Sequence, residues 1–236
     1  MAIEDKEKVL KFGEMSVTGR LIDASNATLF ASVSAEGHQI ECIYKPVAGE
    51  RPLWDFPDGT LAQREFAAYA ISSFGGFNVV PYTLLREGPF GLGMVQEWID
   101  IDESIDLMNF FSLDHPQLRK MALFDAVINN TDRKIGHLLP THSGEVLGCD
   151  HGVTFHTEDK LRTVLWQWAG NPLTETEIAQ LENLLLLIDG ELKPILEELI
   201  TAAEIDATIT RINRLIDSKV FPLPSQEWPP VPWPAF

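Results

Sequence analysis

Two short segments, Asn130-Thr131-Asp132-Arg133-Lys134-Ile135-Gly136-His137 and Cys149-Asp150-His151-Gly152, decide how this chain is interpreted. Between them, apolar runs flank the turn sequence His142-Ser143-Gly144, which predicts a short hairpin over about 137–149. Asp150 thus follows Asp132 by eighteen residues, across this predicted hairpin.

Upstream of these segments, three strands are predicted in succession. Residues 15–22 and 27–34 form the first two, with residues 27–34 alternating roughly with a period of two. Residues 39–45 form the third strand, which ends at Lys45. Short polar connections between consecutive strands favour an antiparallel meander.

A helix and two further strands complete the first half of the chain. Thr60 and Gln63 match a capping box and predict a helix over about 61–74 that carries Glu65 and stops at Gly75-Gly76. Strands are expected near 79–86 and 93–99.

The second half is predicted to be mainly helical. Asp114 is placed to cap a helix over about 115–129, and Thr174 with Glu177 matches a second capping box. Pro194 suits the first turn of the next helix, and a last one is expected to run to about Asp217. Strands followed by helices indicate an α+β fold.

The last sixteen residues, 221–236, contain six prolines together with Trp228 and Trp233. Proline at this density excludes a regular helix and favours an extended polyproline II segment. We expect a strap whose tryptophans bury against the domain; the alternative is a ligand for an aromatic groove of another protein. The sequence leaves open whether the tail docks on its own chain.

Composition restricts the partners. The 236 residues carry a net charge of −17, with 18 Lys and Arg against 35 Asp and Glu, which disfavours nucleic acid and anionic membranes. There is no membrane-length apolar run, and the charged stretch from Met1 to Lys11 does not fit a secretory signal. Cys42 and Cys149 lie in apolar runs and fit buried thiols, so we expect a cytoplasmic protein.

The order of strand lysine, helix glutamate, catalytic-loop aspartate and Asp-x-Gly aspartate resembles the protein-kinase arrangement, in which H-R-D-x-x-x-x-N precedes D-F-G. More closely, the chain resembles the phosphatidylinositol 3-/4-kinase-like family in a bacterial branch. The segment 130–133 is similar to the catalytic loop of type II phosphatidylinositol 4-kinases and HipA-like kinases, and 150–152 to their Asp-x-Gly. The resemblance covers roughly residues 15–170.

This resemblance implies a bilobal protein-kinase-like fold. It comprises an N-lobe over 1–99 with a five-stranded antiparallel sheet, a mostly helical C-lobe over 100–220, and the tail over 221–236. The implied cofactors are ATP and Mg²⁺ or Mn²⁺.

The resemblance also implies roles for individual residues. Lys45 would bind the α- and β-phosphates with Glu65 as its ion-pair partner, and Asp150 would bind the metal. Asp132 would accept the proton of the acceptor hydroxyl or orient that hydroxyl. Lys134 fits either neutralisation of the γ-phosphate or an ordinary solvated loop residue.

Two further segments are candidates for nucleotide contacts. The turn with Ser25 and Asn26 would offer N–H groups and hydroxyls to phosphate, although it lacks a Gly-x-Gly-x-x-Gly pattern. Gln96, Glu97 and Trp98 fall where kinases place the hinge, whose backbone would bind an adenine; the alternative is an ordinary edge strand. Residues 49–56 fit a loop pinned by its aromatic side chains, or a flap over the cleft.

His137 stands where kinases have the metal-binding asparagine. Imidazole is a softer ligand than a carbonyl oxygen and suits Mn²⁺ or Zn²⁺ better than Mg²⁺. His137 is therefore a working metal ligand, the mark of a site that binds nucleotide but transfers poorly, or a hydrogen-bonded histidine at the start of a strand.

Three functions follow from these alternatives. The first is an ATP- and metal-dependent phosphotransferase acting on a hydroxyl of a small molecule or protein. The second is a nucleotide-binding pseudokinase. The third is a nucleotidyl transferase on the same fold.

Overall fold

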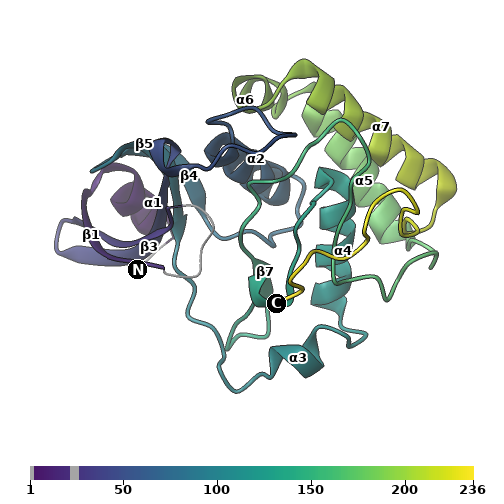
Figure 1. Ribbon diagram of the computed structural model, residues 1–236, viewed down its shortest axis with the longest axis horizontal. Coiled ribbons are helices and arrows are strands. Elements are labelled where there is room, and N and C mark those ends of the chain that lie inside the picture. Colours follow the sequence, from purple (N-terminus) through teal and green to yellow (C-terminus); the bar gives the residue numbers. More distant parts are fainter. Residues whose placement is uncertain (1–2, 22–26) are drawn as a thin grey trace.

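The computed structural model describes residues 3–21 and 27–236 and contains a sheet part and a helical part side by side (Figure 1). The first part of the chain comprises α1 (Ile3–Phe12), β1 (Glu14–Arg20), β2 (Leu29–Ala35), β3 (His38–Pro46), α2 (Leu61–Phe74), β4 (Thr83–Gly88) and β5 (Gly91–Glu97). A 3₁₀ turn, η1 (Val47–Gly49), follows β3.

The remaining elements build the helical part and a small hairpin. They are α3 (Leu107–Phe110), α4 (Pro116–Ile128), η2 (Ile135–His137), β6 (Leu138–Pro140), β7 (Val146–Gly148), α5 (Glu175–Asp189), α6 (Lys193–Leu199) and α7 (Ala202–Ser218). The predicted α+β class, the hairpin and the capping box at Thr174 are confirmed.

The five-stranded sheet has the order β1-β2-β3-β5-β4, and all neighbouring strands are antiparallel. This sheet confirms the predicted five antiparallel strands. β4 begins at Thr83, later than predicted, because Pro81 has no N–H for a strand ladder. The N–H groups of Val79 and Val80 instead donate to the Ser72 hydroxyl.

Helix α1 was not predicted from the charged N-terminal sequence. It forms on one face of the sheet, where Val9 and Leu10 are buried with Val33 and other strand residues. Arg86 of β4 donates to the carbonyl of Leu10 at 2.6 Å and thereby satisfies a carbonyl that the end of the helix leaves without a partner. Residues distant in sequence therefore stabilise this helix.

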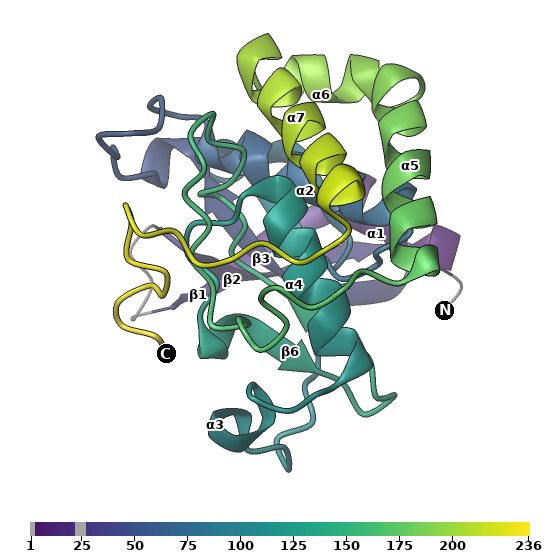
Figure 2. The same cartoon turned by 90° about the vertical axis from the view of Figure 1, so that its right-hand side faces the viewer.

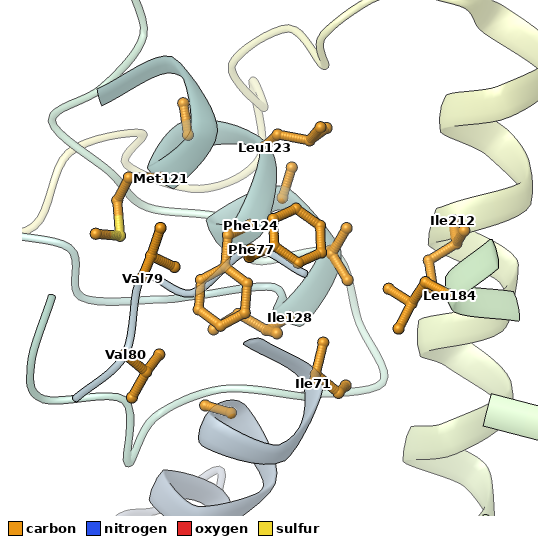
Figure 3. Packing of buried hydrophobic residues seen from close by; sticks show 14 of the residues in the cluster. Ile71, Phe77, Val79, Val80, Met121, Leu123, Phe124, Ile128, Leu184 and Ile212 are labelled. Carbon is orange, nitrogen blue, oxygen red and sulfur yellow. The ribbon is translucent and has the colours of Figure 1, made fainter. Parts of the chain in front are cut away.

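The main hydrophobic core lies in the helical part and includes the segment that leads into β4. Phe77 and Phe124 of α4 face each other with ring centroids 5.4 Å apart, next to Val79 and Met121 (Figure 3). Leu184 and Ile212, among others, belong to the same cluster on the α5 and α7 side. Residues of α2 and α4 thus share one core, which supports the side chains that these two helices contribute near the site.

Two predicted caps are wrong. The N-terminus of α2 is capped by Glu50, whose carboxylate accepts from the N–H groups of Leu61 and Ala62, and Thr60 makes no cap bond. At α4 the cap is His115 and not Asp114. Asp114 instead accepts a hydrogen bond from the Trp168 indole at 3.0 Å.

The tail docks on its own chain, running from the end of α7 across the helical part (Figure 2). The carbonyl of Pro230 accepts from the N–H of Thr163 and from the Trp166 indole. The prediction for the tryptophans is half right: Trp228 is half-buried, but Trp233 is 90% exposed.

In the described parts of the chain, no helix is both long and apolar enough to cross a membrane.

Candidate active site

Lys45 forms the centre of the site. In β3, alternate residues face opposite sides, so Cys42 and Tyr44 are buried in the core with α1 while Lys45 faces the helical part. Its ammonium lies 2.6 Å from a carboxylate oxygen of Glu65 on α2 and 2.7 Å from one of Asp150. The structure therefore brings together three residues that the sequence places far apart.

The charges of this triad depend on one another. Burial disfavours the charge on Lys45, but the attraction of Asp150 and Glu65 outweighs it, and the pKa of Lys45 rises above its usual value. The Lys45 ammonium in turn holds the pKa of Asp150 well below its usual range, against the effect of burial. Burial raises the pKa of Glu65, and Lys45 opposes this rise.

Asp132 lies in a loop that hydrogen bonds hold in place. Its N–H donates to the side-chain oxygen of Asn130, and the side chain of Asn130 donates to Asp125 of α4. Lys134 pairs with the Asp132 carboxylate at 3.3 Å. Burial raises the pKa of Asp132, and Lys134 opposes the rise. Such a carboxylate is suited to accept a proton from a hydroxyl.

Asp132, His137 and Asp150 form a group that fits a metal ion. One ligand atom from each lies within 4.8 Å of the others. Burial lowers the pKa of His137 to about 4, so the imidazole is neutral near pH 7 and has a lone pair to offer. Two hard carboxylate oxygens and one imidazole suit Mn²⁺, and Mg²⁺ mainly through the carboxylates.

A buried network beneath the site was not predicted from the sequence. Arg133 donates to both carboxylate oxygens of Asp125 through Nε and Nη2, and the same Nη2 lies 2.6 Å from Nε2 of His151. Burial and the neighbouring Arg133 hold the pKa of His151 well below its usual value, so its ring is neutral and accepts from Arg133. The N–H of His151 donates to Glu65. The network thus joins the loop over 130–134, which corresponds to the predicted catalytic loop, to the Asp150-His151-Gly152 segment and to α2.

Two cavities meet at the triad. One, of about 410 Å³, lies between β3, the segment after β5 and the hairpin, and its lining includes Ile43, Trp98 and Leu139. The other, of about 590 Å³, lies between the loop after β3, the catalytic loop, residues 160–162 and the tail. Lys45, Asp132 and Asp150 line both cavities.

The hinge candidates line the smaller cavity, but some of their polar groups already have partners. The N–H of Glu97 donates to Tyr82 and that of Trp98 to Glu41. The Gln96 side chain donates to Thr83 at 2.9 Å. An adenine here would have to use other groups, such as the N–H of Ile99, which also lines this cavity.

Ser25 and Asn26, the candidates for phosphate contacts, lie outside the described residues.

Residues 49–56, expected either as a pinned loop or as a flap, have features of both. Phe56 is buried against Arg64, whereas Trp54 is 82% exposed at the edge of the larger cavity.

Arg162 and Lys160, which line the larger cavity, were missed because no sequence motif marks them. They follow the Asp150-His151-Gly152 segment in an irregular stretch, and only the fold brings them to the same cavity as Asp132.

The chain was also compared with known proteins and solved structures. The fold is similar to that of the Helicobacter pylori proinflammatory kinase CtkA in its crystal structure, with a TM-score of 0.51 and 12% identity over 90% of this chain and 94% of that one. The chain therefore has a kinase-like fold.

No protein-family model matches the chain. Protein Rv2133c of Mycobacterium tuberculosis is 41% identical over 268 aligned positions, which cover 99% of this chain and 96% of the relative. The chain belongs to the same family as Protein Rv2133c.

Proposed function

We propose that the protein is an ATP- and metal-dependent phosphotransferase of the phosphatidylinositol 3-/4-kinase-like type, acting on a hydroxyl group. One observation carries the proposal: Lys45, Asp132 and Asp150 form the shared wall of two cavities. A transferase needs a donor site and an acceptor site that meet at the reacting phosphorus. The kinase-like fold supports the same conclusion.

The smaller cavity would hold the nucleotide, with Lys45 donating to its phosphates. Of the three residues that fit a metal ion, Asp150 and His137 would hold the divalent metal, which neutralises phosphate charge when bound, and Asp132 would be left for the acceptor. Asp132 would take the proton of the acceptor hydroxyl as its oxygen forms a bond to the γ-phosphorus. The bond from that phosphorus to the bridging oxygen breaks, and ADP leaves.

A phosphoinositide is a poor candidate for the acceptor because the net charge of −17 opposes approach to an anionic membrane. A nucleotide-binding protein without transfer is the second candidate. It is favoured by His137, which replaces the oxygen ligand of active kinases with an imidazole.

Calorimetric titration with ATP, in the presence of Mg²⁺ and then Mn²⁺, tests the proposal together with a measurement of ADP release. Metal-dependent binding and ADP release, both lost in Asp150→Asn, are expected. Asp206→Asn is a matched control because Asp206 is exposed on α7, remote from the cavities. Binding without ADP release favours the second candidate, and no binding with either metal contradicts both.

A further inference from the structure

Arg162 contributes to the wall of the larger cavity. The Arg162 backbone is held from both sides, because its N–H donates to the carbonyl of Asn130 at 2.9 Å and its own carbonyl accepts from Arg133 at 3.1 Å. Its side chain lines this cavity but not the smaller one. The fold therefore fixes the backbone of Arg162 next to the loop that carries Asp132, at the wall of the larger cavity.

The guanidinium of Arg162 is poorly satisfied by the protein. Its Nε is buried and has no hydrogen-bond partner, and a terminal nitrogen makes one long contact of 3.4 Å with the carbonyl of Val231. No ion pair of Arg162 occurs within the described part of the chain. A buried donor without a partner costs free energy unless a ligand accepts from it.

Each acidic side chain that lines this cavity already has a hydrogen-bond or ion-pair partner within the protein. Glu50 caps α2, Glu65 and Asp150 pair with Lys45, and Asp132 pairs with Lys134. Asp55 pairs with Lys160 at 3.3 Å. In a chain of net charge −17, Arg162 thus stands out as a cation at a cavity whose carboxylates already have partners.

The outer wall of the cavity limits the size of its ligand. The Lys160 ammonium lies 4.8 Å from the ring centroid of Trp54 and 4.5 Å from that of Trp228. This contact ties the loop after β3 to the tail, and Trp228 and Pro229 complete the wall. A volume of about 590 Å³ falls within the range of about 300–1,000 Å³ that is typical of small-molecule sites.

We propose that Arg162 binds a phosphate or carboxylate group of a small hydroxylated molecule and so holds its hydroxyl at Asp132. The inference rests on the proposed function and specifies the acceptor class: an anionic small molecule rather than a protein. The planar guanidinium binds either anion through paired hydrogen bonds.

The test uses three anions of increasing complexity, inorganic phosphate, D-glycerate and glycerol 3-phosphate, with neutral glycerol for comparison. Each is titrated calorimetrically into the full-length protein, with and without a non-hydrolysable ATP analogue and Mg²⁺. At least one anion is expected to bind more tightly than glycerol, and the preferred anion distinguishes a carboxylate from a phosphate ligand.

Arg162→Gln is expected to weaken binding of that anion by roughly tenfold or more, because a charged hydrogen-bond partner is lost. Its nucleotide affinity should stay within about twofold of the wild type, since Arg162 does not line the smaller cavity. Arg162→Lys should retain part of the anion affinity. Lys193→Gln removes the same charge from an exposed position on α6 and should change neither affinity.

Equal binding of glycerol and the anions, or undiminished anion binding by Arg162→Gln, overturns the inference. Binding of none of the three anions at millimolar concentration does so as well. A fall in nucleotide affinity in Arg162→Gln would assign this residue to the donor phosphates instead. If nucleotide binding fails but phosphate binding depends on Arg162, the proposed function falls and the anion site remains.

Discussion

Arg133 and Asp125 form a fully buried ion pair, in which the guanidinium donates to both oxygens of the carboxylate at 2.9–3.2 Å. The pair joins the end of α4 to the catalytic loop. Because the ring of His151 also contacts Arg133, the same pair supports the segment that carries Asp150.

Removing one partner leaves a buried charge without compensation. Asp125→Ala is therefore expected to lower the free energy of unfolding by about 3–5 kcal/mol, measured by urea denaturation. The exposed control Asp206→Ala should change it by less than about 0.5 kcal/mol. The double variant Asp125→Ala/Arg133→Met should recover part of the loss; if it is less stable than Asp125→Ala alone, the explanation by an unpaired charge is wrong.

Substitutions of Asp132 and Asp150 should affect different steps, transfer in the first case and ATP binding in the second. Asp150→Asn removes negative charge that the metal needs in the bound complex, so metal-dependent ATP binding should disappear. Asp132→Asn should keep most of the binding and slow transfer by about 10²–10⁴-fold, as expected for loss of a general base. Calorimetry and ADP release on both variants provide the measurement. Equal losses of binding in the two variants would contradict the assigned roles.

His137→Asn should change the metal preference. An amide oxygen is a harder ligand than imidazole, so the ratio of ATP affinity with Mg²⁺ to that with Mn²⁺ should rise. His38→Asn, at an exposed position at the start of β3, serves as the control. An unchanged ratio would mean that His137 does not touch the metal.

Glu50→Ala tests the cap of α2. Its carboxylate accepts from Leu61 and Ala62, so its loss should lower the free energy of unfolding by about 0.5–2 kcal/mol. Gln63→Ala should have a smaller effect, because the Gln63 side-chain oxygen has no hydrogen-bond partner. Thermal denaturation of both variants shows which of the two residues caps α2. A larger loss of stability in Gln63→Ala would favour the capping box that the sequence predicts.

The fold class was predictable because strand alternation, capping residues and glycine stops act over a few residues. Lys45, Glu65, Asp132 and Asp150 could be chosen because the order of their motifs follows that of kinases, and the structure places them together. The metal and nucleotide roles of these residues, and the domain boundaries at 99 and 220, stay predictions.

The features that could not be predicted from the sequence depend on contacts between residues that are distant in the chain. The cap at α2 comes from Glu50, eleven residues before Leu61, and α1 forms because Arg86 and the sheet stabilise it. Arg162 is marked by no motif; its importance arises from a buried nitrogen and a cavity wall that exist only after folding.

The docked tail has a practical consequence for work with this protein. The carbonyl of Ala235 accepts from the N–H of Ile135, and the ring of Phe236 lies against Gly136, next to His137 in the sequence. Any affinity tag fused after Phe236 would therefore emerge beside the catalytic loop. A preparation that carries such a tag and shows no activity would therefore not test the proposed function, and a cleavable tag at the opposite terminus is the sounder choice.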